Sequence, residues 1–85
     1  MDEDLRRQKR IEWNRPGKII SLLGHHVCNC LVKDISQSGA RLLVPVSEIV
    51  PDFFRLDFGS EDIKPKCSVR WRRDKELGVR FIGGE

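Results

Sequence analysis

Hydrophobic and polar residues alternate along several short segments of the chain, and turn-forming residues separate these segments. The segment 53–58 alternates with Phe54, Leu56 and Phe58 on one face, and the segment 67–72 alternates in the same way. A period of two predicts half-buried β-strands rather than helices. Strands are expected over residues 19–23, 25–32, 41–44, 53–58, 67–72 and 77–81.

The predicted strands are short and follow one another closely. Several short strands with turn signals between them favour a closed antiparallel barrel, because closure leaves no strand edge exposed. The inward side chains are expected to include Phe54, Leu56, Phe58, Leu77, Val79 and Phe81. In the segment 25–32, alternation places His26, Cys28, Cys30 and Val32 on one face. We therefore predict an all-β fold, a small six-stranded antiparallel barrel.

The chain divides into an arm, a barrel and a short tail. Residues 1–16 are expected to form a flexible basic arm, in which 2–10 is a transient helix and 14–17, Asn-Arg-Pro-Gly, is the turn that ends it. The barrel is assigned to residues 17–82 and the tail to 83–85.

Composition bounds the class of protein. The 85 residues make one small domain, and 39% hydrophobic with 34% charged residues is typical of a folded soluble chain. No apolar run is long enough to span a membrane, and the N-terminus does not resemble a signal peptide. Three cysteines, two of them at positions 28 and 30, argue against a disulfide framework. We expect a cytoplasmic protein.

The net charge of +3 is unevenly distributed. Residues 64–75 contain many lysines and arginines against Asp74 alone, whereas residues 48–62 are mainly acidic. If the basic stretch shares a face with the basic N-terminal segment, the two form a surface that attracts anions. An exposed strand of alternating charges explains the same pattern equally well.

Two short motifs carry the most specific chemistry. Residues 6–10 read R-R-x-x-R, so Arg6, Arg7 and Arg10 offer planar guanidinium groups that bind phosphate and stack on bases. Residues 34–39 read D-x-S-x-x-G, in which Asp34 is a pure acceptor and Ser36 an adaptable donor or acceptor. Gly39 is expected to supply a positive φ or a close approach of the ligand to the backbone. Separately, the motifs also fit a solvated face and a hairpin turn.

Together, in this order before a run of strands, the motifs resemble the PilZ domain. The pair Val69 and Trp71, followed by Leu-Gly-Val-Arg-Phe at 77–81, is similar to the closing hairpin of that family, so the resemblance covers roughly residues 6–82. It implies a receptor for the bacterial second messenger cyclic di-GMP, without enzymatic activity or a cofactor. The chain departs from many members by lacking a C-terminal helix.

The resemblance implies a binding site made of Arg6, Arg7, Arg10, Asp34, Ser36 and Gly39. Trp71 is a further candidate at the barrel mouth, although its alternation with Cys67 and Val69 favours a packing role. The arm would close over the ligand against the D-x-S-x-x-G hairpin and signal to a partner protein. The receptor is expected to be a monomer or a weak dimer.

The same residues bear on other functions. The side chains of His26, Cys28 and Cys30 share a strand face, but their spacing is not that of a structural zinc site, so no metal is expected. Ser36 has no histidine within its motif to activate it, which argues against catalysis. Two alternatives stay open: a basic barrel that binds RNA or single-stranded DNA, which the scarcity of aromatic residues disfavours, and a PilZ-like module that binds only proteins.

Overall fold

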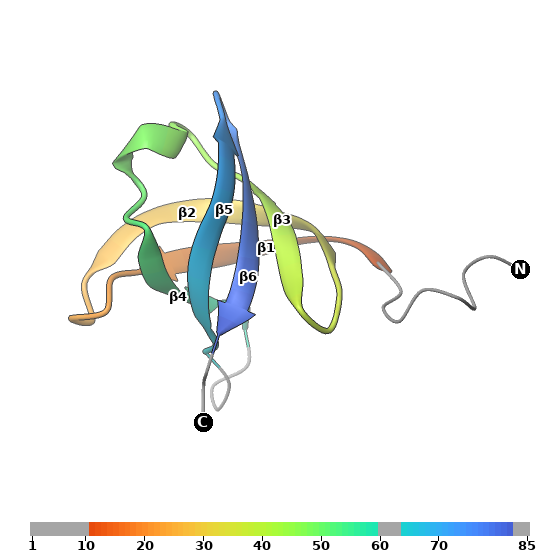
Figure 1. Cartoon of the computed structure of the whole chain (residues 1–85), viewed down its shortest axis with the longest axis horizontal. Coiled ribbons are helices and arrows are strands. Elements are labelled where there is room, and N and C mark those ends of the chain that lie inside the picture. The colour runs from red at the N-terminus through yellow and green to blue at the C-terminus, as the bar shows by residue number, and fades with distance from the viewer. Residues whose placement is uncertain (1–10, 60–63, 83–85) are drawn as a thin grey trace, which may run out of the picture.

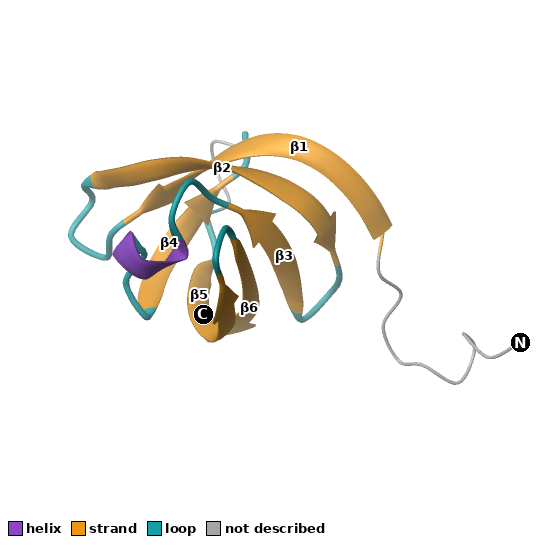
Figure 2. Cartoon of the chain, turned by 90° about the horizontal axis from the view of Figure 1, so that it is seen from above, coloured by secondary structure: helices purple, strands orange, loops and turns teal. Residues whose placement is uncertain are grey.

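The computed structural model describes residues 11–59 and 64–82 and shows an all-β barrel of antiparallel strands, as predicted. The strands close in the order β1-β2-β3-β6-β5-β4 (Figure 1). Their bounds are β1 Ile11–Ile20, β2 His26–Ile35, β3 Gly39–Leu43, β4 Phe53–Asp57, β5 Lys66–Arg73 and β6 Glu76–Ile82. One short 3-10 helix, η1 (Ser47–Ile49), lies between β3 and β4 (Figure 2).

The barrel interior is filled by the side chains that alternation assigned to it. Phe54, Leu56 and Leu77 are completely buried, and Val79 is nearly so. Phe58 and Phe81 are half-buried and pack against this core. The three cysteines are also buried as small apolar groups and form no disulfide. The core therefore confirms the predicted inward faces of β4 and β6.

The first strand begins at Ile11, not at Ile19, so the assignment of residues 11–16 to an arm was wrong. Residues 14–17, predicted as a turn, are instead part of β1. The strand continues through a bulge, because Asn14 adopts a left-handed conformation with a φ of 48°. Pro16 is tolerated because this part of β1 pairs only with β2, while pairing with β4 starts at Lys18. Residues 1–10 and 83–85, which complete the predicted arm and tail, lie outside the described residues.

Bulges in β2 and β5 change which side chains face outward. Val32 pairs with Leu42 and Asp34 pairs with Arg41, so Lys33 is the extra residue of β2. In β5, Arg70 is the extra residue between Val69 and Trp71. Each bulge shifts the alternation by one position, which turns the following residue to the outer face.

Trp71 shows the effect of the second bulge. The expected packing role was wrong, because its side chain lies on the outer face of the barrel and is 42% exposed. Without the extra residue in β5, alternation from the buried Cys67 through Val69 would have placed the indole inside.

Arg72 joins the β5–β6 hairpin to η1. Its guanidinium group donates to the carbonyl oxygens of Ser47 and Val50 and to the Asp52 carboxylate, the last two at 2.8 and 2.7 Å. These bonds satisfy carbonyls of a connection that has no strand partner. No helix in the described part of the chain is long and apolar enough to cross a membrane.

Candidate functional site

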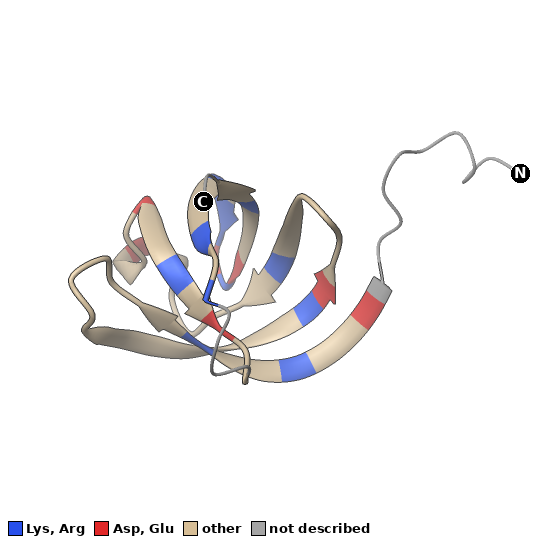
Figure 3. Cartoon of the chain, turned by 90° about the horizontal axis from the view of Figure 1, so that it is seen from below, with Lys and Arg blue, Asp and Glu red and all other residues tan. Residues whose placement is uncertain are grey.

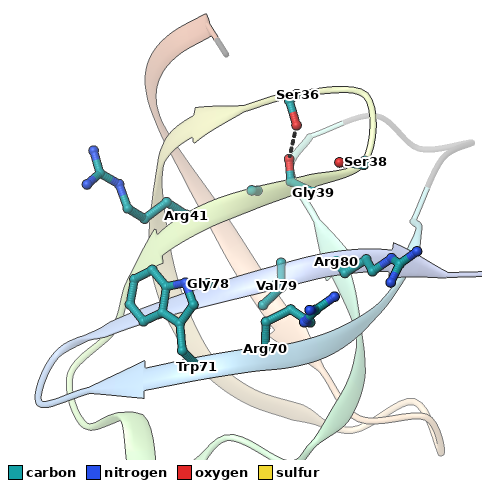
Figure 4. A pocket seen from close by; sticks show the side chains of 10 residues that line it. Ser36, Ser38, Gly39, Arg41, Arg70, Trp71, Gly78, Val79 and Arg80 are labelled. Carbon is teal, nitrogen blue, oxygen red and sulfur yellow. Dashed lines mark hydrogen bonds between the residues drawn. The ribbon is translucent and has the colours of Figure 1, made fainter. Parts of the chain in front are cut away.

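The D-x-S-x-x-G hairpin borders a cavity of about 430 Å³ on the outer surface of the barrel. Strands β3, β6 and β5 form its floor (Figure 4). Its lining consists of Ser36, Ser38, Gly39, Ala40, Arg41, Arg70, Trp71, Gly78, Val79 and Arg80. Ser36, Gly39 and Trp71, predicted from separate parts of the sequence, thus meet in one cavity.

The hairpin between β2 and β3 is held by its own backbone and by β6. The Ser36 N–H donates to the Gly39 carbonyl at 2.8 Å, and the Ser36 hydroxyl reaches the same oxygen at 3.4 Å. The Phe81 N–H donates to the Ser38 carbonyl at 2.7 Å, which ties the hairpin tip to β6. The serine side chains at the cavity rim are therefore presented by a fixed loop.

Gly39 is required for a reason that differs from the expected positive φ. It is the first residue of β3, and its φ lies outside the left-handed region. A Cβ at this position would overlap the Val79 carbonyl oxygen, because β3 and β6 approach closely here. Glycine therefore permits strand contact at the edge of the cavity.

The strand register aligns Glu12, Asp34, Arg41, Gly78 and Trp71 in one outward row across β1, β2, β3, β6 and β5. Side chains of directly paired residues lie on the same side of a sheet and interact. Asp34, which is only 4% exposed, accepts two bonds through Oδ2 from Arg41, at 2.8 Å from Nη2 and 3.1 Å from Nε. The row thus leads from the N-terminal strand to the cavity.

Arg41 is held between two carboxylates. Besides Asp34, Glu76 of β6 lies 3.6 Å from its Nε. The guanidinium plane is therefore fixed at one end of the cavity, and its charge is compensated. Arg70 and Arg80 differ, because neither forms an ion pair with a carboxylate among residues 11–59 and 64–82. These two exposed arginines leave the other end of the cavity positively charged.

The Trp71 indole covers Gly78, its neighbour in the row (Figure 4). A Cβ on Gly78 would overlap the Cε2 and Nε1 atoms of the ring, so only glycine lets the ring lie so close to β6. The guanidinium carbon of Arg73 lies 5.5 Å from the ring centroid, within the range of a cation–π contact. An exposed indole beside arginines suits a flat anionic ligand.

The sequence motifs identified only part of this site. Asp34 does not line the cavity but accepts bonds from Arg41, which does, and Arg6, Arg7 and Arg10 lie outside the described residues. Arg41, Arg70, Gly78 and Arg80 were not predicted as site residues. Arg41 lies two positions after Gly39, the last residue of the D-x-S-x-x-G motif. In a strand, alternation places these two residues on the same face, so the sequence could have indicated Arg41 as a site residue. The sequence held no such indication for Arg70, because the bulge that it forms is not visible in the alternation pattern.

The cysteines and histidines form no second site. Burial raises the pKa of the Cys30 and Cys67 thiols to about 12, with a smaller contribution from a neighbouring cysteine in each case. Thiols of such high pKa are protonated at neutral pH and are poor nucleophiles. Within the described ranges, no group of three His, Cys, Asp or Glu side chains is placed to hold a metal ion.

A comparison with protein families agrees with this geometry. The family model described as PilZ domain matches residues 4–85, nearly the whole chain. No curated protein matches the chain.

Proposed function

The chain belongs to the PilZ domain family, a family of cyclic di-GMP receptors, and on this premise we propose that it binds cyclic di-GMP in the cavity beside Ser36 and Gly39. The protein acts in this proposal as a receptor and not as an enzyme. The observation that carries it is the convergence on one cavity of the D-x-S-x-x-G hairpin, the exposed Trp71 ring and two arginines, Arg70 and Arg80, that pair with no carboxylate among residues 11–59 and 64–82.

The cavity offers a partner for each part of the ligand. Cyclic di-GMP has two phosphates, and the guanidinium groups of Arg70 and Arg80 suit their oxygens. The exposed Trp71 ring offers a stacking surface for a guanine base. Guanine N–H donors require an acceptor, and Asp34 serves them by exchanging its bonds to Arg41 for bonds to the base.

The arginines of the N-terminal segment complete the site in this proposal. Arg10 directly precedes β1 in the sequence, and the first residues of β1 pair with Asp34 and Ile35 beside the hairpin. From there, Arg6, Arg7 and Arg10 close over the ligand, and the ordered segment presents a new surface to a downstream partner protein. Such ordering of a segment on ligand binding is a common switching device.

Calorimetric titration of the full chain with cyclic di-GMP tests the proposal. Arg10→Ala and Asp34→Ala are each expected to weaken binding by about 1–3 kcal/mol, the range for a good contact to guanine. Arg10→Lys should also lose most of the affinity, because lysine lacks the planar group.

A matched control is Arg55→Ala on β4, which removes one arginine that does not line the cavity. Its affinity should equal that of the unchanged chain. Absence of binding up to tens of micromolar ligand would refute the proposal. Stronger binding of a single-stranded oligonucleotide, falling steeply with salt, would favour the nucleic-acid alternative instead.

A further inference from the structure

A second basic surface lies on the outer face of β4, β5 and β6. The register places Phe53, Ser68 and Arg80 in one outward row and Arg55, Lys66 and Ile82 in the next. We call these six residues the β4–β6 surface. Only Arg80 also lines the ligand cavity, so the two sites adjoin but do not coincide.

The positive charges of this surface repel one another within the fold. Arg55 and Lys66 are directly paired across β4 and β5, and like charges in this arrangement destabilise a sheet. Arg55 donates to the Lys64 carbonyl oxygen at 3.1 Å, but none of Arg55, Lys66 and Arg80 forms an ion pair with a carboxylate in the described part of the chain. Figure 3 shows the basic and acidic positions along the strands. Since no carboxylate of residues 11–59 and 64–82 pairs with these cations, they suit an external anion.

An apolar group stands beside these cations. The Phe53 side chain is 49% exposed, while its neighbour Phe54 is completely buried and fills the core. Phe53 therefore adds nothing to the barrel interior. Aromatic residues and arginines are enriched where proteins bind one another, and exposed lysines and arginines at the rim steer acidic partners.

We propose that the β4–β6 surface binds a short acidic segment of a partner protein. Carboxylates of that segment pair with Arg55 and Lys66, and one apolar side chain packs on Phe53. Because every strand of the closed barrel already has two neighbours, recognition uses side chains and not the addition of a strand. This site does not depend on cyclic di-GMP binding.

The aspartate at the end of β4 favours a short segment over a nucleic acid. Asp57 faces outward on β4 two positions after Arg55, and the Asp52 side chain, 77% exposed, precedes Phe53. They border the surface at both ends of β4. Asp52 is held by its ion pair with Arg72, so the repulsion that a phosphate backbone continuing along β4 would meet comes from Asp57, whereas a short peptide can place its carboxylates before that residue.

The test uses the full chain, labelled with ¹⁵N, and an acetylated nine-residue peptide with two central leucines among glutamates and aspartates. Addition of the peptide is expected to shift the amide signals of Phe53, Lys66 and Ser68 in a saturable way. Lys66→Glu should weaken binding at least tenfold. Lys75→Glu, the same charge change in the turn between β5 and β6, should change it less than twofold. Equal effects of the two variants, or no saturable shifts, would overturn the proposal.

Three further measurements distinguish this proposal from misfolding, from nucleic-acid binding and from the proposed cyclic di-GMP site. Lys66→Glu should not lower the melting temperature, because it replaces a like-charged pair by an opposite one, so misfolding cannot explain lost binding. Displacement of the peptide by an oligonucleotide of equal charge at a lower concentration would show a nucleic-acid surface and overturn the proposal. Cyclic di-GMP affinity should be the same in Lys66→Glu and the unchanged chain, so failure of one proposal is distinguishable from failure of the other.

Discussion

Gly78 controls how the Trp71 ring meets β6. Because a Cβ at this position would overlap the indole, Gly78→Ala must displace the ring from the cavity floor. We expect cyclic di-GMP affinity to fall by about 1–3 kcal/mol, the contribution of a base stacked on an aromatic ring. Calorimetric titration measures the change.

Gly24→Ala is the control for that variant. Gly24 has a φ of +96° but no atom within 4 Å of an added Cβ, so the substitution strains the β1–β2 turn without touching the cavity. It should cost about 1 kcal/mol of stability and leave affinity unchanged. Equal affinity losses in both variants would mean that Gly78 acts through stability alone.

The buried thiols make stability depend on alkaline pH. Folding raises the pKa of Cys30 and Cys67 from 9.0 to about 12, so the folded chain retains protons that the unfolded chain loses. This contribution to stability is fully present below pH 9 and is lost as pH rises from 9 towards 12. The urea midpoint should therefore fall between pH 8 and pH 10.5.

Replacement of both cysteines supplies the comparison. A Cys30→Ala, Cys67→Ala variant is less stable at pH 8, because it leaves cavities in the core, but its urea midpoint should fall less over the same pH range. The chain has no tyrosine to titrate in this window. Parallel pH curves for the two proteins would contradict the assignment to the thiols.

Strands β4 and β5 contain a like-charged pair whose replacement can stabilise the fold. Arg55 faces Lys66, and Lys66→Glu turns this repulsion into attraction. Urea unfolding should show a gain of about 0.2–1 kcal/mol, the usual range for such a pair. Adding Arg55→Glu restores a like-charged pair, so the double variant should lose the gain. A gain that persists in the double variant would place its cause elsewhere.

The sequence pattern predicted most strands but not their irregularities. Alternation located β4 and β6 and their buried side chains, because a regular strand repeats every two residues. Alternation misplaced the start of β1, where Asn14 is part of a bulge. It also placed Trp71 on the wrong side of β5, where Arg70 is the extra residue of a bulge. A bulge depends on pairing with a neighbouring strand, and that pairing is not encoded in local alternation.

The candidate site was predicted in the same partial way. Asp34, Ser36 and Gly39 lie within one six-residue stretch, so a short motif was sufficient to single them out. Arg41 and Trp71 face the cavity because strands distant in sequence align around Gly78, which only the closed barrel establishes. The roles of Arg6, Arg7 and Arg10 stay predictions.

From the balance of charge over the molecule, we expect the proposed ligand binding to depend on salt concentration. The net charge is +3, and in the proposed complex Arg70 and Arg80 face a ligand with two negative phosphates. Between 0.05 and 0.5 M sodium chloride, we expect affinity for cyclic di-GMP to fall several-fold, because screening shortens the range of these attractions to a few ångströms. Calorimetry at both concentrations measures this. An unchanged affinity would mean that stacking dominates and that the arginines contribute little.

The position of Trp71 gives the molecule a built-in optical reporter. Its indole is exposed at the cavity, whereas Trp13, the other tryptophan, packs edge-on against Phe58 with ring centroids 5.4 Å apart. Indole emission depends on solvent and on nearby groups, so a ligand that covers Trp71 changes the spectrum while the signal of Trp13 stays constant. Occupancy of the cavity can thus be followed in real time without a dye, and a Trp71→Phe variant supplies the blank.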